Sequence, residues 1–146
     1  MYSSVLGLHS YWAFAVLGLL LIASLNAFAG LSAKRPFLPK DRQISMIALT
    51  FVHVQFLLGL VLIFVSPAMD VLKSEGMGTV MKDSNLRLLL VEHPLINLIA
   101  VSLITIGWSK HKREASDNGK FKKIGIFYVI GLALLLTRIP YGQWLD

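Results

Sequence analysis

The chain has 146 residues, of which 55% are apolar and only 15% are charged. A soluble domain carries about 25% charged residues, whereas residues 1–33 contain no Asp, Glu, Lys or Arg at all. This composition excludes a soluble enzyme, a disordered tail and a secreted disulfide scaffold. The lack of cysteine excludes disulfides, thiolate metal sites and Cys-x-x-Cys-His haem attachment. The net charge of +6 comes from short basic segments between apolar runs, which indicates membrane topology rather than nucleic-acid binding.

Four apolar segments follow one another along the chain, and a helix of about 20 residues crosses a bilayer. They predict one all-α transmembrane domain over residues 1–146, with helices at about 6–31, 44–65, 86–108 and 122–138. The last segment is the shortest. Asp41 and Ser84 are the predicted N-caps of the second and third helices.

The segments between these helices differ in character. Residues 34–42 and 109–123 are predicted basic loops, and residues 67–83 form a longer loop that is too apolar for free solvent. We expect this longer loop to lie on the outer surface as a short interfacial segment or lid.

The distribution of positive charge predicts the orientation in the membrane. Ten of the 14 Lys and Arg residues lie within 34–42 and 109–123, and the other four lie on the opposite side. The positive-inside rule then places the two basic loops in the cytoplasm and both termini outside. The sequence therefore predicts a multi-pass, up-down-up-down four-helix bundle of the inner (cytoplasmic) membrane.

Polar side chains within a membrane span are costly, so each needs a reason. The candidates are His9, His53, Gln55, Glu92, His93 and Asn97. His9 lies ~7.5 Å along its helix if that helix begins near Ser4, and His93 lies ~13 Å along its own if that one begins near Ser84. The first and third helices run in the same direction and are diagonal neighbours in such a bundle. Two imidazoles at similar depth across the bundle axis are the arrangement that a bis-histidine haem needs.

Three further residues accompany this pair. Asn97 lies four residues after His93 and shares its helix face, so it is a candidate partner of the ligand or of a neighbouring group. Arg87 and Arg138 lie near the outer ends of the third and fourth helices, where either is a candidate partner of haem propionates.

The other histidines have simpler readings. His53 lies ~20 Å from the outer end of its helix, which is deeper than His9. It is an alternative haem ligand only if its helix is shifted or kinked. Otherwise it is a candidate contact for a proton or a quinone. Each intramembrane histidine also has a structural reading, as hydrogen-bonded packing between helices. His111 falls in a basic loop and is read as a solvated residue. Five aromatic residues include predicted interface anchors, and those near helix ends need no other function: Trp12, Trp108, Tyr128, Tyr141 and Trp144.

Three short motifs recur in an order that resembles a known family. They are His9-Ser-Tyr-Trp-Ala13, His53-Val-Gln-Phe-Leu-Leu-Gly59 and Glu92-His93-Pro94. The chain resembles one half of the haem A synthase family, and over nearly its whole length the small four-helix membrane proteins called cytochrome b in Bacteroidetes. The resemblance implies that His9 and His93 ligate haem b. The chain departs from the haem A synthase family at Leu6, where that family has a catalytic glutamate. It also corresponds to only one of the two four-helix halves, and it lacks the external cysteine pair of many family members.

The sequence thus favours a membrane-embedded b-type cytochrome, with iron held by His9 and His93 and with quinone or a redox protein as electron partner. Two alternatives stay open. One is a haem-free accessory subunit of a larger complex, in which the buried polar groups hold helices together. The other is a degenerate or dimeric relative of haem A synthase. An electron carrier or a subunit is favoured over a stand-alone enzyme. The expected partners include the lipid bilayer and do not include nucleic acid. Its oligomeric state stays open.

Overall fold

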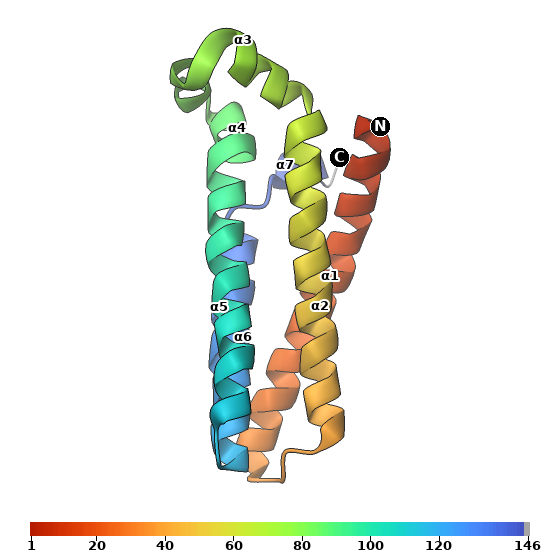
Figure 1. The fold of residues 1–146 in the computed structure, drawn as a ribbon, viewed down its shortest axis with the longest axis vertical. Helices are drawn as coiled ribbons and strands as arrows, with labels where there is room; N and C mark the ends of the chain where they lie inside the picture. Colours follow the sequence, from red (N-terminus) through yellow and green to blue (C-terminus); the bar gives the residue numbers. More distant parts are fainter. Residues whose placement is uncertain (145–146) are drawn as a thin grey trace.

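The computed structural model describes residues 1–144, which are helical almost throughout and include no strand (Figure 1). The elements are α1 (Tyr2–Ala33), α2 (Pro39–Val65), α3 (Pro67–Lys82), α4 (Ser84–Arg87), η1 (Leu88–Glu92), α5 (His93–Arg113), α6 (Asp117–Thr137) and α7 (Tyr141–Trp144). The all-α prediction is confirmed for this part of the chain.

The long helices lie side by side, with α1 packed mainly on α2 and α6, and α5 packed mainly on α2 and α6. Figure 1 shows the N-terminus, α3 and α7 at one end, which we call the cavity end. The connections 34–38 and 114–116 lie at the opposite end, which we call the basic end. Both α1 and α5 run from the cavity end to the basic end.

Three helical stretches of the described residues are long and apolar enough to cross a membrane: Tyr2–Ala33, Pro39–Val65 and Ser84–Arg113. The protein is therefore a candidate membrane protein. The fourth predicted crossing, α6, is not among these helices. Its stretch without charged residues is short, because it lies between Lys123 and Arg138. That crossing stays a prediction.

Several predicted boundaries differ from the observed ones. The predicted loop 109–123 is almost entirely helical, since α5 continues to Arg113 and α6 begins at Asp117. Three of its six Lys and Arg residues lie in the last turn of α5, where they stabilise the helix dipole, and the other three lie in the first two turns of α6. Ser116 caps α6 by accepting from the Gly119 amide. The predicted loop 67–83 is helix α3, which crosses the cavity end and is interrupted at Gly76, where φ is +86°.

Both predicted N-caps are wrong by one or more positions. The residue before α2 is Leu38, and Asp41 lies in the first turn and accepts a 2.8 Å hydrogen bond from the Leu38 amide. The residue before α4 is Asp83, whose carboxylate accepts from the amides of Asn85 and Leu86. A carboxylate at the N-cap or in the first turn can accept from backbone amides that have no partner within the helix. The residue type alone therefore does not show which of the two positions an Asp occupies.

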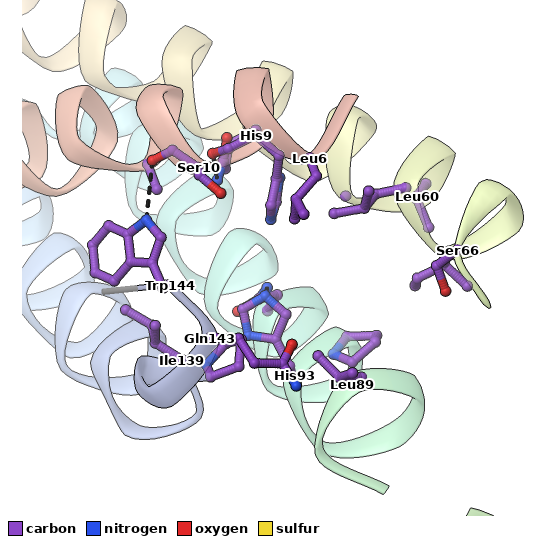
Figure 2. Close-up of a pocket in the computed structure, with 18 of the residues that line it drawn as sticks. Leu6, His9, Ser10, Leu60, Ser66, Leu89, His93, Ile139, Gln143 and Trp144 are labelled. Carbon is purple, nitrogen blue, oxygen red and sulfur yellow. Dashed lines mark hydrogen bonds between the residues drawn. The ribbon is translucent and has the colours of Figure 1, made fainter. Parts of the chain in front are cut away.

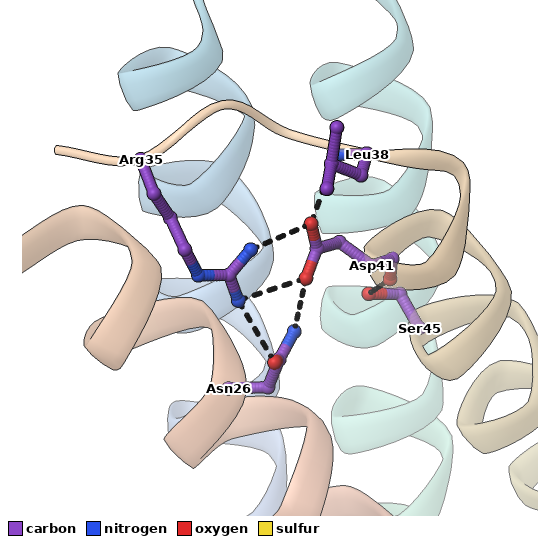
Figure 3. A network of polar contacts seen from close by, with 5 residues as sticks. All are labelled: Asn26, Arg35, Leu38, Asp41 and Ser45. Carbon is purple, nitrogen blue, oxygen red and sulfur yellow. Dashed lines mark hydrogen bonds and ion pairs between the residues drawn. The ribbon is translucent and has the colours of Figure 1, made fainter. Parts of the chain in front are cut away.

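The connection between α1 and α2 is held by a buried polar network (Figure 3). Asp41 is only 2% exposed and accepts hydrogen bonds from Arg35 at 2.8 and 2.9 Å and from Asn26 at 2.9 Å. Arg35 also donates to the side-chain oxygen Oδ1 of Asn26 at 3.0 Å. These bonds to Asp41 raise the pKa of Arg35. The network ties the end of α1 to the start of α2.

The well-packed core lies toward the basic end. Its buried residues include Leu20 and Ala23 of α1, Val52 of α2, Ile104 of α5 and Tyr128 of α6. The Tyr128 hydroxyl donates to the Ser45 carbonyl at 2.8 Å, joining α6 to α2. Toward the cavity end the same helices leave a hollow between them, which holds the candidate site.

The packing of α6 against α5 depends on glycine at position 131. A Cβ at Gly131 would lie 2.4 Å from Ile104 Cγ1 and 3.3 Å from the Ala100 carbonyl oxygen. Small residues allow membrane helices to approach closely and gain packing contacts. The position of α6 against α5 therefore depends on the missing side chain at Gly131.

Candidate functional site

A cavity of about 480 Å³ lies between α1, α2 and the continuous stretch α4–η1–α5, and α7 closes one side (Figure 2). Its walls are mostly apolar. The polar side chains that line it include His9, Gln55, His93 and Asn97. A largely apolar cavity with a few converging polar groups is the usual form of a small-molecule or cofactor site.

The cavity brings His9 and His93 together. Their ring centres are 6.3 Å apart and the ring planes meet at 86°. In Figure 2 the two rings point toward one another from α1 and from the start of α5. The similar depths of His9 and His93 along their predicted helices led us to expect that the two rings face each other. The structure places them in this way.

His9 is positioned by helix α2. Its backbone carbonyl accepts a 2.9 Å hydrogen bond from the Gln55 side-chain amide. Its ring lies against Gly59, where a Cβ would come within 3.3 Å of His9 Cε1. Gly59 therefore leaves the space that the imidazole occupies.

His93 is positioned by hydrogen bonds to both ring nitrogens. Its Nδ1 lies 2.8 Å from the Arg138 carbonyl oxygen, and its Nε2 lies 3.0 Å from the Asn97 side-chain nitrogen. Because a carbonyl oxygen only accepts, Nδ1 carries the proton and Nε2 presents its lone pair. Asn97 thus shares a face with His93, as its spacing predicts.

A wide helical turn precedes His93. The π-helical segment η1 spans Leu88–Glu92, directly before α5. Pro94 has no N–H to donate to a preceding carbonyl, so a regular α-helix is interrupted there. Such π-bulges occur frequently at functional sites.

Three polar atoms of the cavity lining are buried without a hydrogen-bond partner in the described structure. They are Nδ1 of His9, Oε1 of Gln55 and Oδ1 of Asn97. Buried polar atoms are normally paired, and an unpaired one costs about 1–3 kcal/mol. Their concentration in one cavity is typical of a binding site for a polar or metal-containing group.

The remaining predicted site residues lie elsewhere. His53 is exposed and its Nε2 lies 2.9 Å from the Thr105 hydroxyl, so the structure does not bring it to the cavity. Arg87 forms an ion pair with Glu92 at 3.0 Å and donates to the Met81 carbonyl. The Arg138 side chain is exposed, and only its backbone carbonyl reaches His93.

Two aromatic readings from the sequence are corrected. His111 is 2% exposed rather than solvated, packs on Phe37 and Trp108, and its Nδ1 hydrogen-bonds to the Trp108 carbonyl. Trp144 is more than an interface anchor, because it lines the cavity and donates to the Ser10 carbonyl at 3.1 Å (Figure 2). It also stacks on Phe14 at 4.6 Å between ring centres.

Sequence reasoning missed α7 as a wall of the site. Gln143 donates to Asn85 Oδ1 at 2.8 Å, so α7 joins α4 as well as α1. The break at Pro140 is visible in the sequence, but no periodic signal indicates that the following residues fold back.

The described residues contain no group of three or more His, Cys, Asp or Glu placed to hold a metal ion. A metal at this cavity would thus depend on the two histidines together with a ligand that supplies the other coordination positions. Comparisons with models of protein families, with curated proteins and with solved structures find no match.

Proposed function

We propose that the protein is an integral membrane b-type cytochrome that holds one haem between His9 and His93. The observation that carries this proposal is the facing pair of imidazoles, 6.3 Å between ring centres, in a largely apolar cavity. Haem, when bound, supplies one-electron chemistry through its iron.

The spacing of the two rings fits the group. An imidazole nitrogen binds a first-row metal at about 2 Å and lies about 1 Å from its own ring centre, so a metal held in line between two imidazoles separates their centres by roughly 6 Å. The volume of about 480 Å³ is also in the range of sites that hold cofactor-sized molecules.

The surroundings of His93 fit a metal ligand as well. Metal-binding histidines usually donate their other ring N–H to a carbonyl or carboxylate, which fixes the tautomer and the ring orientation. The Arg138 carbonyl takes this part for Nδ1 of His93. The lone pair of Nε2, which accepts from Asn97 in the described structure, is the one that would hold iron.

The other residues would orient and shield the group. Gly59 leaves room for the His9 ring, and Gln55 fixes the backbone of His9. The apolar walls and α7 exclude water. The propionate role predicted for Arg87 and Arg138 is not part of the proposal, because Arg87 is paired with Glu92 and neither side chain lines the cavity.

We further propose that α1, α2, α5 and α6 cross the inner membrane in alternating directions, with the basic end in the cytoplasm and both termini outside. The excess of Lys and Arg at the basic end supports this orientation. The haem would then lie in the outer half of the bilayer, exchanging electrons with a quinol or a redox protein.

A second candidate is a haem-free accessory subunit of a larger membrane complex. It is favoured by the hydrogen bonds that already engage both ring nitrogens of His93 within the chain. An activity like that of haem A synthase is not proposed, because Leu6 lines the cavity at the position where that family carries its glutamate.

The deciding experiment is a dithionite-reduced minus air-oxidised absorption spectrum of the detergent-purified protein, with haem quantified as its pyridine adduct. The proposal expects a sharp low-spin α-band and about one haem b per chain. A folded but colourless protein from haem-replete cells would reject the cytochrome and favour the accessory subunit. Mixing the purified protein with a water-soluble quinol then tests the electron donor.

A further inference from the structure

A second cavity, of about 440 Å³, lies at the basic end. It is formed where the α1–α2 connection meets the start of α2, the end of α5 and the start of α6. Three cationic side chains line it, Arg42, Lys112 and Lys120, together with the buried ring of His111. Residues far apart in the sequence thus bring their positive charges to one hollow.

Aromatic faces hold these cations in place. The guanidinium carbon of Arg42 lies 5.5 Å from the Trp108 ring centre, and Lys112 Nζ lies 6.0 Å from the same ring. Lys120 Nζ lies 5.8 Å from the ring centre of Phe37. Cations within about 6 Å of an aromatic face are attracted to it, so the two rings favour these positions of the three charges.

The rings of Trp108, His111 and Phe37 pack against one another beside the cavity. Trp108 is 8% exposed and packs on His111, with ring centres 4.5 Å apart, and Phe37 packs on the other side at 5.6 Å. The hydrogen bond from His111 to the Trp108 carbonyl fixes its ring between them. The three rings therefore pack together beside the cationic side chains of the cavity.

Within the described residues, none of the three cations forms an ion pair, and no carboxylate lines the cavity. Two of the nearby acids have partners elsewhere, and Asp117, three residues before Lys120 in α6, is exposed and does not line the cavity. Asp41 accepts from Arg35, Asn26 and the Leu38 amide, and Glu114 lies 3.9 Å from Lys123. Three positive charges that line one cavity, with no carboxylate in its lining, favour the binding of an anion.

We propose that this cavity binds a phosphate group, as presented by the headgroup of an anionic phospholipid. Phosphate oxygens accept charge-assisted hydrogen bonds from Arg and Lys, and basic pockets between membrane helices on the cytoplasmic side bind anionic lipid headgroups. Phe37, Leu38 and Pro39, which also line the cavity, are apolar enough to contact the glycerol and upper acyl chain. A soluble phosphate compound offers the same chemistry, and the experiment separates the two sources.

The test uses the full chain in phospholipid nanodiscs and reads the midpoint of thermal unfolding. One series replaces phosphatidylcholine stepwise with phosphatidylglycerol. A second series keeps pure phosphatidylcholine and adds inorganic phosphate at constant ionic strength. The pocket variant carries Arg42→Gln, Lys112→Gln and Lys120→Gln. The control carries Lys40→Gln, Lys110→Gln and Lys122→Gln, which removes the same charge from exposed positions outside the cavity.

We expect phosphatidylglycerol to raise the midpoint of the wild type and the control in a saturable way. The pocket variant should need a much higher fraction of this lipid, with affinity about tenfold weaker for each cation removed. If that variant does not fold, Lys112→Gln alone repeats the comparison, because Lys112 is exposed.

Three outcomes are informative in different ways. A saturable response to inorganic phosphate that the pocket variant loses supports the phosphate site and assigns it a soluble ligand. An equal loss in control and pocket variants would show diffuse attraction to the membrane surface and overturn the proposal. No response to either compound would also overturn it. None of these measurements depends on haem, so they are separate from the test of the cytochrome.

Discussion

His9 and His93 face each other at right angles, with 6.3 Å between ring centres, although α1 and α5 pack mainly on α2 and α6 rather than on one another. Their relative position is thus set by other residues. Gly59 of α2 makes room for the His9 ring, and the Arg138 carbonyl after α6 orients His93. Helix α2 and the end of α6 therefore determine the separation of the two rings.

Removing either histidine of the pair should abolish haem binding. We expect His9→Ala and His93→Ala to lose the reduced α-band while far-ultraviolet circular dichroism keeps its helical signal, because each removes one of the two histidines that would hold the haem iron. His53→Ala is the matched control and should keep the band, since His53 lies outside the cavity. Unchanged spectra in both single variants would rule out the assignment.

A side chain at Gly59 should displace the His9 ring. A Cβ there already lies 3.3 Å from Cε1, so the larger Gly59→Val must push the imidazole away. Shifting a ligand through its support typically costs about 10- to 100-fold in metal affinity. Titration of the haem-free protein with haemin measures this loss. Gly18→Val, where a Cβ meets no atom within 4 Å, should bind as the wild type does; equal losses in both variants would contradict the proposed contact.

The buried carboxylate of Asp41 should contribute to stability. We expect Asp41→Ala to lower the free energy of unfolding by about 1–3 kcal/mol, because the Asn26 and Leu38 amides lose their acceptor. Denaturant unfolding in detergent measures this change. Asp70→Ala removes an exposed carboxylate of α3 and should have little effect. A similar small effect at Asp41 would mean that water replaces the network at no cost.

The same network has a defined pH dependence on its alkaline side. Hydrogen bonding to Asp41 raises the pKa of Arg35 above its ordinary value. The stability that this shift contributes is fully present below the ordinary pKa of arginine and is lost only as the pH rises through the raised value. Unfolding midpoints of the wild type and Arg35→Gln should therefore differ by a constant amount from neutral to moderately alkaline pH. A gap that closes within that range would contradict the pairing.

A methyl group at Gly131 should push α6 away from α5. Its Cβ would lie 2.4 Å from Ile104 Cγ1 and 3.3 Å from a backbone carbonyl, so the helix itself has to move. Overpacking of this kind costs about 1–3 kcal/mol, and we expect Gly131→Ala to lower the thermal midpoint. Gly18→Ala should leave the midpoint unchanged or raise it, because alanine favours helix by about 1 kcal/mol and meets no neighbour there. A neutral Gly131→Ala would show that α6 shifts freely.

Sequence reasoning succeeded where the signal is local. The apolar segments predict the long helices, and the four-residue spacing places Asn97 beside His93. It failed where a residue's surroundings come from another part of the chain. His111 has the flanking charges of a solvated loop residue, but Phe37 and Trp108 bury it. Nor does any local pattern place Trp144 against Ser10.

The sequence by itself determined that the protein is helical and that polar residues stand within its apolar stretches. It predicted four membrane crossings, of which three helices of the structure are long and apolar enough. These properties follow from composition and helical periodicity, which neighbouring residues carry. Only the tertiary structure decided which histidines meet and which carbonyl orients them. It also decided that three cations gather over the rings of Phe37 and Trp108. Such contacts join residues distant along the chain, and they arise only when close packing selects one arrangement of the helices.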